Sequence, residues 1–463
     1  MIKKLRKCNI VKSVLFPIFA TLLLFVILKS AEAGDPTGIT TNTEDSKGIK
    51  SSLNLAWILL CAFLVFNMQA GFSFLGAGFL QRKNTLNYLT MTYMDFCVGS
   101  FIYWAFGFAL MFGGSFLASG LDKGNSFIGF SGFFLMGNAH DFYTLAIWLY
   151  QVMFACATCT IVAGAVAERF KLHAHLLYSV LLCGILYPIY GHWVWGGGWL
   201  ANLPIGAGFK DFAGSGVVHG MGGMVALVGA WMVGPRFGKY NSDGTPNIIH
   251  GHNLSYVILG TLFLIFGWFG FNVGSTLSVS DFSISVIAVN MFLAIITGAI
   301  TLLYVSYIAT GKSDITMACN GSLAGCVAIT ASGAYIPPWA AVVIAIVAGF
   351  ILRSCLYFVE FKLRIDDPIG AIAVHGANGL WGLLSVGIFA DGSYLGVKGL
   401  ITGSGWQLLA QLIGCVTLIV WTFGVGFLIF FLLEKTIGLR VPIKEEIAGI
   451  DAYEHGMSCY QSS

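Results

Sequence analysis

The sequence predicts an all-α polytopic membrane protein whose eleven transmembrane helices form an inverted repeat of five plus five, followed by one more. Three observations predict this class. Of the 463 residues, 57% are hydrophobic and only 10% are charged, a balance that excludes an ordinary soluble domain. Apolar stretches of about 18 residues or more recur along the chain, as transmembrane helices require. One motif also occurs twice, in segments of opposite predicted direction.

The N-terminus predicts a targeting segment. Residues 1–33 combine a basic start, an apolar centre and the small-residue step Ala31-Glu32-Ala33, which is typical of a cleaved signal peptide. A retained helix is the alternative. Residues 34–52 are predominantly polar, lack periodicity up to Lys50 and are expected to form an extracytoplasmic lead-in.

The membrane domain is expected at 53–434 and a cytoplasmic tail at 435–463. The eleven predicted spans are 53–78, 86–113, 142–167, 173–194, 215–234, 254–276, 282–309, 315–331, 337–360, 370–389 and 406–433. Removal of a signal peptide places the mature N-terminus outside, and an odd number of spans then places the C-terminus in the cytoplasm.

The distribution of basic residues tests this topology, because cytoplasmic loops carry an excess of Lys and Arg. Thirteen lie on the predicted inside and five on the outside, as expected for a multi-pass protein of the plasma (inner) membrane. The inside set is Arg82, Lys83, Arg169, Lys171, Arg236, Lys239, Lys312, Arg353, Lys362, Arg364, Lys435, Arg440 and Lys444; the outside set is Lys47, Lys50, Lys123, Lys210 and Lys398. The net charge of +3 therefore reflects topology, and a nucleic-acid partner has no support.

The repeated motif is D-x-x-G-x-x-x-V-H-G, found at 211–220 and at 367–376. A further glycine, Gly223 or Gly379, follows each copy three residues later. Five spans separate the copies, so they are predicted to be antiparallel in the membrane. This is the arrangement of inverted-repeat transporters, whose sites lie near the midplane between the repeats.

The two motif histidines are predicted to meet at the centre of the bilayer. Asp211 is expected at the outer surface and Asp367 at the inner surface, each eight residues before its histidine. Eight residues of helix advance about 12 Å, against a half-thickness of about 15 Å. A single intramembrane histidine is often a core residue bonded to a carbonyl, but His219 and His375 in matched registers favour a pathway or proton relay.

Cofactor and metal chemistry are not predicted. A transmembrane histidine pair could ligate a haem, but no C-x-x-C-H or second histidine pair is present. The eleven cysteines show no zinc spacing, and Cys156-x-x-Cys159 lies inside a span rather than in a thioredoxin-like setting. We expect no cofactor, no metal site and no enzymatic activity.

Aromatic and hydroxyl residues cluster near the predicted outer ends of two spans. Trp195, in GHWVWGGGWL, suits either a vestibule wall or an interfacial aromatic belt. Phe271 and Ser275, in FGWFGFNVGS, are four residues apart and share one helical face. A ring and a hydroxyl so placed could hold a small cation. Phe154, in the third span, suits a path lining or core packing equally well.

Five segments together resemble the signatures of the ammonium transporter family, in its Amt branch within the Amt/Mep/Rh group. They are WVWGGGWL, DFAGSGVVHG, FGWFGFNVGS, CNGSLAGCVAIT and DDPIGAIAVHGANGLWG. The similarity runs from the first span to GLRVP in the tail and so covers nearly all of the mature chain.

The resemblance implies a homotrimer of eleven-helix subunits, each with its own central pore. Trp195 and Ser275, beside Phe154, match the outer substrate-binding site, and Phe154 with Phe271 matches the stacked pore gate. His219 and His375 match the paired pore histidines. Asp211 matches the aspartate that supports the outer site structurally and electrostatically, and Asp367 holds the same place in the second copy.

Two features refine the resemblance. Fifteen residues separate Trp195 from Asp211. This segment is longer than in enteric bacterial members, so the resemblance does not define the shape of the outer mouth. Histidine at the first pore position, where some fungal members have glutamate, is similar to the bacterial and plant type.

The implied function is ammonium transport. The outer site recruits NH4+, which loses its proton near the phenylalanine gate. NH3 then crosses the hydrophobic pore while H+ moves separately along the histidines, giving net electrogenic uptake. Gas conduction in the Rhesus manner stays open within the family. A sensor without transport is a further alternative, whose mark is a fused signalling domain; the tail after Glu434 is expected to be too short for one. A PII-type regulatory protein at the inner mouth, or tail phosphorylation, is the implied regulation.

Overall fold

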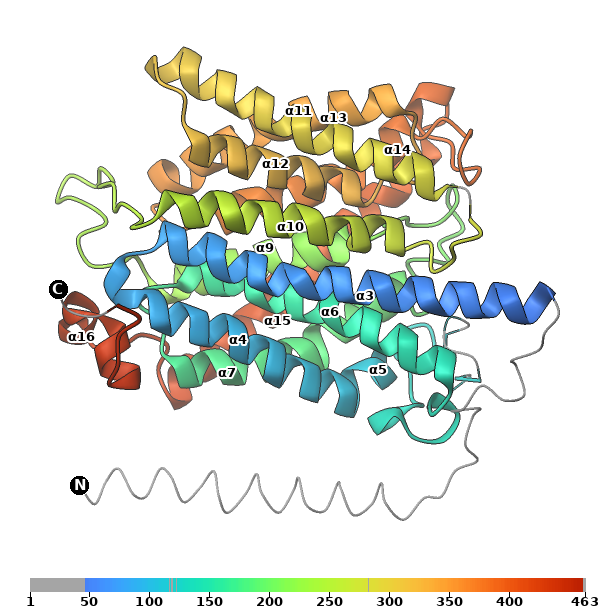
Figure 1. The fold of residues 1–463 in the computed structure, drawn as a ribbon, viewed down its shortest axis with the longest axis horizontal. Helices are drawn as coiled ribbons and strands as arrows, with labels where there is room; N and C mark the ends of the chain where they lie inside the picture. The colour runs from blue at the N-terminus through green and yellow to red at the C-terminus, as the bar shows by residue number, and fades with distance from the viewer. Residues whose placement is uncertain (1–45, 116, 118–119, 122, 282, 461–463) are drawn as a thin grey trace.

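The computed structural model describes residues 46–115, 117, 120–121, 123–281 and 283–460, and every regular element in these ranges is a helix (Figure 1). The all-α class predicted from the sequence is therefore confirmed. The predicted signal peptide at 1–33 and residues 34–45 of the predicted lead-in lie outside the described residues.

The chain folds into α-helices that are joined in several places by short π or 3-10 turns. The α-helices are α3 (Ser46–Phe79), α4 (Thr85–Ile102), α5 (Phe108–Phe112), α6 (Phe142–Val166), α7 (Leu172–Leu181), α8 (Tyr187–Val194), α9 (Met221–Val233), α10 (Leu254–Gly274), α11 (Ile284–Thr310), α12 (Ile315–Thr330), α13 (Pro338–Tyr357), α14 (Asn378–Phe389), α15 (Trp406–Thr436) and α16 (Ile443–Ala448). The π turns are η3 (Tyr103–Gly107), η6 (Leu182–Leu186), η7 (Ser215–Gly220), η8 (Phe358–Lys362), η9 (Ile372–Ala377) and η11 (Asp451–His455). The 3-10 turns are η2 (Arg82–Asn84), η4 (Phe133–Leu135), η5 (Gly137–Ala139) and η10 (Leu400–Thr402).

Each of the eleven predicted spans coincides with a helical segment. In the described residues, ten are long and apolar enough to cross a membrane. The eleventh, α12, has only 16 residues, about 24 Å of helix, which is less than the hydrocarbon thickness of about 30 Å. The first helix begins at Ser46 rather than at 53, so the lead-in is helical at its end; residues 46–52 contain no proline to stop the helix.

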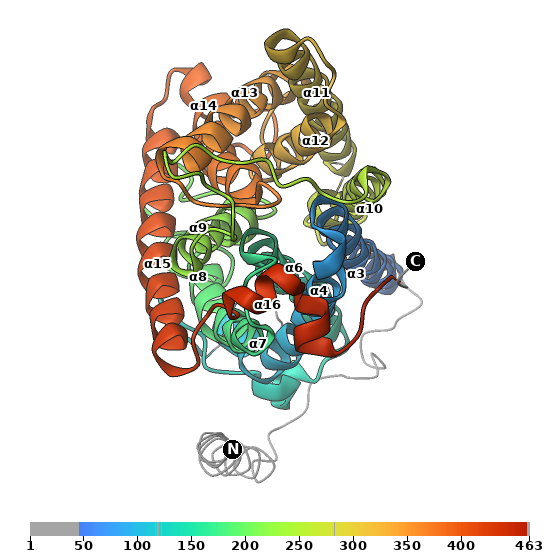
Figure 2. The same ribbon diagram turned by 90° about the vertical axis from the view of Figure 1, so that its left-hand side faces the viewer.

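Seen end-on, the two halves of the chain occupy two parts of the bundle (Figure 2). Helices α3 to α9 form one part and α10 to α14 the other, and α3 packs along α10 between them. The last long helix, α15, lies along one side and contacts both α9 and α14. The extra span therefore bridges the two repeats.

The loops predicted to lie inside share one end of the bundle with the tail (Figure 1). Lys83 donates to the carbonyls of Glu446 and Ile447 in the tail. Lys171 donates to the carbonyl of Ile437, and Arg440 to that of Val233. Lys83, Lys171 and Arg440, all predicted to lie inside, therefore gather at this end of the bundle.

The two motif copies pack against each other in a reciprocal way, as a two-fold relation between inverted repeats requires. A Cβ added to Gly223 would lie 2.0 Å from the backbone nitrogen of Gly376, and one added to Gly379 would lie 2.6 Å from that of Gly220. Gly223 and Gly379 each follow their own histidine by four residues, and Gly220 and Gly376 by one. The same contact is therefore made twice, and only glycine permits so close an approach of backbones.

Candidate functional site

The two motif histidines lie in contact inside the bundle. Their Nδ1 atoms are 3.2 Å apart, and their ring centroids are 5.2 Å apart at an interplanar angle of 22°. Both side chains are buried. One Nδ1 must carry a proton and the other a lone pair, because two N–H groups or two lone pairs would repel.

Matching aspartate caps bring the histidines to this position. Asp211 accepts from the backbone N–H groups of Gly214 at 3.0 Å and of Gly216 and Val217 at 2.9 Å. Asp367 accepts from Gly370 at 3.0 Å and Ile372 at 2.7 Å. These carboxylates therefore bind the otherwise unpaired N–H groups at the start of each helix.

A glycine in the left-handed region follows each aspartate by three residues. Gly214 has φ +108° and Gly370 has φ +84°, values that residues with a Cβ adopt at a cost. The chain then enters a π turn, η7 or η9, which carries the histidine. Such wide turns often occur at functional sites, and the sequence pattern did not predict them.

Burial raises the pKa of the Asp211 carboxyl to about 6, although backbone N–H donors favour the charged form. Burial likewise raises the pKa of Asp367 against the same kind of donors. Of the two motif carboxylates, Asp211 is the one at the predicted outer end, next to Trp195, whose indole binds its backbone carbonyl.

On the outer side of the histidines, aromatic rings form a continuous column. Phe271 lies 5.2 Å from His219 between ring centroids, and Phe154 stacks on Phe271 at 3.9 Å and 21°. Trp195 meets Phe154 edge-on at 6.1 Å and 82°. The structure thus brings together the predicted gate pair, the predicted outer tryptophan and the histidines.

Polar contacts fix the outer end of this column. The Trp195 indole Nε1 donates to the backbone carbonyl of Asp211 at 2.7 Å. The Ser275 hydroxyl lies 2.8 Å from the carbonyl of Phe271, to which it donates, and 3.2 Å from the Tyr150 hydroxyl. Trp195 and Ser275 are both partly exposed. Because the Ser275 hydroxyl donates its hydrogen to the Phe271 carbonyl, the lone pairs of its oxygen can accept from an incoming N–H donor.

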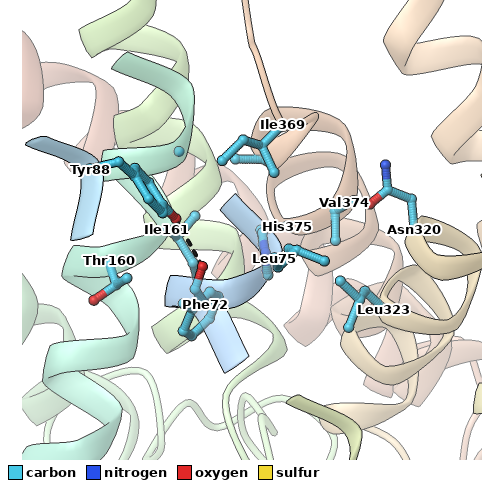
Figure 3. A pocket seen from close by; sticks show the side chains of 12 residues that line it. Phe72, Leu75, Tyr88, Thr160, Ile161, Asn320, Leu323, Ile369, Val374 and His375 are labelled. Carbon is cyan, nitrogen blue, oxygen red and sulfur yellow. Dashed lines mark hydrogen bonds between the residues drawn. The ribbon is translucent and has the colours of Figure 1, made fainter. Parts of the chain in front are cut away.

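An apolar cavity continues the line on the inner side of His375 (Figure 3). Its walls come from both halves of the chain: Phe72, Leu75, Tyr88, Thr160, Ile161, Gly164, Asn320, Leu323, Ile369, Ala371, Val374 and His375. The Tyr88 hydroxyl donates to the carbonyl of Phe72 at 3.1 Å. The buried Oδ1 of Asn320 has no hydrogen-bond partner in the described part of the chain.

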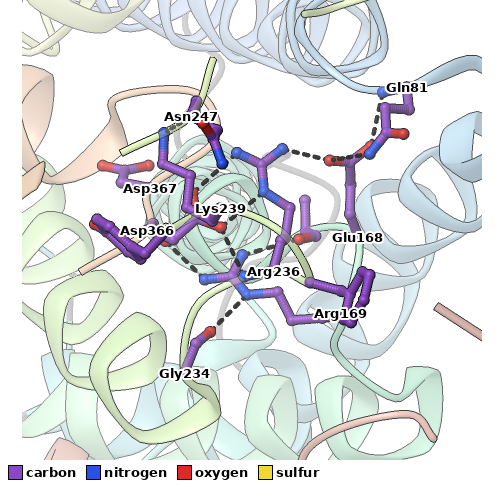
Figure 4. Close-up of polar contacts among 12 residues, drawn as sticks. Gln81, Glu168, Arg169, Gly234, Arg236, Lys239, Asn247, Asp366 and Asp367 are labelled. Carbon is purple, nitrogen blue, oxygen red and sulfur yellow. Dashed lines mark hydrogen bonds and ion pairs between the residues drawn. The ribbon is translucent and has the colours of Figure 1, made fainter. Parts of the chain in front are cut away.

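A buried ionic cluster at the tail end of the bundle joins the two halves (Figure 4). Arg236 donates to Asp366 through Nε at 2.7 Å and Nη2 at 2.9 Å, and it also pairs with Glu168. Although burial opposes its charge, Arg169 and Arg236 hold the pKa of Asp366 below its usual range. Asp366 directly precedes Asp367, so the cluster also fixes the start of the His375 segment.

Sequence reasoning missed several of these residues. Trp268 stacks on His219 at 4.8 Å and 20°, and Tyr150 links Phe154 to Ser275. A 3.6-residue period from Phe271 and Phe154 could have found both, since Trp268 and Tyr150 lie three and four residues earlier. The buried pair of Asp95 and His175, 2.8 Å apart, carries no repeat or motif and could not be singled out.

The haem alternative does not fit this geometry, because Nδ1 atoms 3.2 Å apart leave no room for a porphyrin between them. Among the described residues, no three His, Cys, Asp or Glu side chains form a group that could hold a metal ion. Cys156 and Cys159 contact different partners, Ser100 and Asp95.

Comparisons with a family model, related sequences and solved structures all indicate the same protein family. A model described as Ammonium Transporter Family matches residues 56–460. Ammonium transporter Amt2 of Archaeoglobus fulgidus is 45% identical over 453 residues, covering 95% of this chain and 94% of its own. Ammonium transporter 1 member 3 of Solanum lycopersicum is 37% identical, with 90% and 94% covered.

Solved structures agree. One described as a Sensor Amt Protein superposes with a TM-score of 0.80 at 37% identity, over 88% of this chain and 99% of that one. Mep2 of Candida albicans gives 0.75 at 29% identity, over 85% and 87%. The predicted resemblance is confirmed over almost the whole membrane domain, and the chain belongs to the ammonium transporter family.

Proposed function

We propose that the protein transports ammonium through a pore within the subunit, from the Trp195 end of the aromatic column to the cavity beside His375. The names of its relatives support the substrate. The contact between His219 and His375 in the middle of this line is the observation that carries the proposal.

Recruitment occurs at the outer end. Ammonium is compact and strongly hydrated, so it must exchange water for other partners before it enters. The faces of Trp195 and Phe154 offer quadrupole attraction, worth about 2 kcal/mol or more when desolvated. The Ser275 oxygen accepts one N–H, and the Asp211 carboxylate behind Trp195 adds a favourable field.

Deprotonation follows at the ring stack. Moving an unpaired ion into an apolar conduit is expensive, and the stacked rings of Phe154 and Phe271 leave no water shell for it. Ammonium can escape this cost by giving up a proton, whereas potassium cannot. The apolar lining therefore selects for a guest that can become neutral.

The proton crosses separately along the imidazoles, while ammonia passes beside them. Each neutral ring has one donor and one acceptor nitrogen, as a relay requires. The Nδ1–Nδ1 contact supports this assignment, since it forms only when one ring donates and the other accepts. Two adjacent imidazolium ions would repel, so the pair exchanges one proton at a time. Net flux is then electrogenic.

The test is current on a solid-supported membrane, measured in proteoliposomes with ammonium and with potassium. His219→Ala and His375→Ala should each abolish most of the ammonium current, and Asp or Glu at either position should admit potassium. His173→Ala is the matched control, because His173 is exposed. Unchanged ammonium currents in both alanine variants would count against the relay.

Ammonium sensing is a second candidate, favoured by the likeness to a protein described as a Sensor Amt Protein. The same current separates the two functions. A protein that binds ammonium, shown by a rise in melting temperature, but passes no current is a sensor.

We further propose a signal peptide at 1–33, a plasma (inner) membrane location with the N-terminus outside, and a homotrimeric assembly. The cytoplasmic tail, 435–463, is the expected contact for a PII-type protein. Protease protection in vesicles tests the orientation, and native mass spectrometry tests the assembly.

A further inference from the structure

His192, near the end of α8, makes contacts that the proposed path does not use. It lies three residues before Trp195 and is buried, with 1% of its surface exposed. Its Nδ1 is 2.7 Å from the carbonyl oxygen of Met111, and its Nε2 is 2.7 Å from that of Asn125. Both partners are backbone carbonyls, which only accept hydrogen bonds.

This geometry constrains the protonation state. A neutral imidazole carries one N–H, so its other nitrogen would point a lone pair at a carbonyl oxygen 2.7 Å away. Both contacts are hydrogen bonds only when the ring holds both protons. Space is also short, because a Cβ added to Gly196 would lie 2.0 Å from the Met111 oxygen and 2.6 Å from Nδ1 of His192.

The backbone of His192 holds the turn that carries Trp195. Its carbonyl accepts from the N–H of Gly196 at 3.0 Å and of Gly198 at 2.9 Å. The side chain of His192 thus binds the backbone at Met111 and Asn125, while its main chain binds the turn at 195–200.

Three consecutive backbone carbonyls join the loop at 124–131 to the end of α8 and to the turn that follows it. That of Asn125 binds His192, that of Ser126 accepts from the N–H of Trp199 at 3.0 Å, and that of Phe127 accepts from the Trp193 indole at 3.0 Å. Of these three contacts, only the one to His192 depends on a titratable group.

Few ionisable groups surround the ring. The segments that supply its partners, 108–115 and 124–131, contain none, and neither does the turn at 195–200. Its own helix adds Tyr187 and Tyr190, Lys123 directly precedes the loop, and Asp211 is the buried carboxyl of the mouth. The two carbonyl dipoles are therefore the direct partners of the charge.

We propose that His192 is a positioning residue, held as an imidazolium, that clamps the 124–131 loop onto the turn bearing Trp195. The effect on recruitment rests on the proposed function, whereas the charge of the ring does not.

The first test measures the protonation state of the His192 ring directly. Solid-state 15N NMR of histidine-labelled protein in proteoliposomes distinguishes imidazolium from neutral tautomers. The His192 signals are assigned by their loss in His192→Gln, or by contact with a 13C-labelled Met111 carbonyl if that variant fails to fold. We expect both nitrogens of His192 to be protonated, because each lies 2.7 Å from a carbonyl oxygen. A neutral His192 at neutral pH overturns the proposal.

The second test reads transport. Glutamine carries its two donor hydrogens on one nitrogen and cannot reproduce the two separate ring donors of His192. His192→Gln should therefore raise the apparent KM for ammonium several-fold, with little change in maximal current or potassium exclusion. His173→Gln, at an exposed site, is the control. An equal loss of affinity, rate and selectivity would instead indicate general damage and contradict a positioning role. Absence of all current in the wild type would defeat the proposed transport function while leaving the NMR result to stand.

Discussion

At the scale of single residues, the outer tryptophan shows how the site combines attraction with positioning. Trp195 and Phe154 meet edge to face, and the indole N–H of Trp195 is held by the carbonyl of Asp211. Its donor is already used inside the protein, so only its π face is left for a guest. This arrangement suits a cation, which binds to the face of a ring.

Trp195→Ala should therefore weaken recruitment more than selectivity. Loss of about 1–2 kcal/mol of ring attraction predicts a KM for ammonium higher by roughly 5- to 30-fold. Potassium should stay excluded, because the ring stack and histidines are unchanged. Concentration-dependent currents measure both quantities, and Trp195→Phe, which keeps a ring, is the control. A parallel loss of affinity and potassium exclusion would contradict this division of roles.

The residues that could be predicted are those that sit in a repeat or a helical period. The copies of D-x-x-G-x-x-x-V-H-G led to His219 and His375, and the i, i+4 spacing led to Phe271 and Ser275. His192 has no such signal. Its role depends on two carbonyls from segments about 70–80 residues away, which a local pattern does not encode.

At the scale of elements, the number and order of the spans followed from hydropathy, but their internal geometry did not. An α turn and a π turn can have the same apolar composition, so hydropathy could not predict the π turns η7 and η9. The start of α3 was also misplaced, because helical hydrogen bonding continues beyond the apolar stretch that marks a span.

The crossing of the repeats predicts an intolerance to added methyl groups. Gly223→Ala and Gly379→Ala should each force the backbones apart, since the new Cβ would lie 2.0 Å from Gly376 and 2.5 Å from the Ser215 carbonyl, respectively. Both variants should melt at a lower temperature in detergent and lose current. Gly424→Ala, in α15, meets nothing within 4 Å and should be neutral or slightly stabilising, by about 0.5–1 kcal/mol. Equal melting temperatures for all three variants would refute close contact at the crossing.

At the scale of the whole molecule, the two halves are joined by contacts of different chemistry at different depths. Glycines and histidines meet at the centre, and ions meet at the tail end, where Arg236 of the first half binds both Glu168 of the same half and Asp366 of the second. The repetition of one motif in two segments of opposite predicted direction predicted the contact of the histidines. The second joint, at the tail end, arises from loops that come together only in the fold.

Asp366→Asn should loosen this second joint in a pH-dependent way. The folded protein lowers the pKa of Asp366, so its charge stabilises the fold above the unfolded value of about 3.9 and ceases to do so as pH falls through the lower folded value. We expect a loss of about 3–5 kcal/mol at neutral pH, as for a broken buried pair, which diminishes below about pH 4. Thermal melting across pH measures it. Asp243→Asn, on an exposed loop, should have no effect, and equal behaviour of the two variants would rule out the assigned role.

The stacked gate has a kinetic consequence. In the proposed pathway, rings whose centroids are 3.9 Å apart close the route at rest, so each passage would require Phe154 and Phe271 to rotate aside. Throughput is then governed by how often these side chains fluctuate rather than by how fast a small molecule diffuses. Transport through such a pathway should be slow and saturable, and its rate should depend strongly on temperature, even without a large rearrangement of helices.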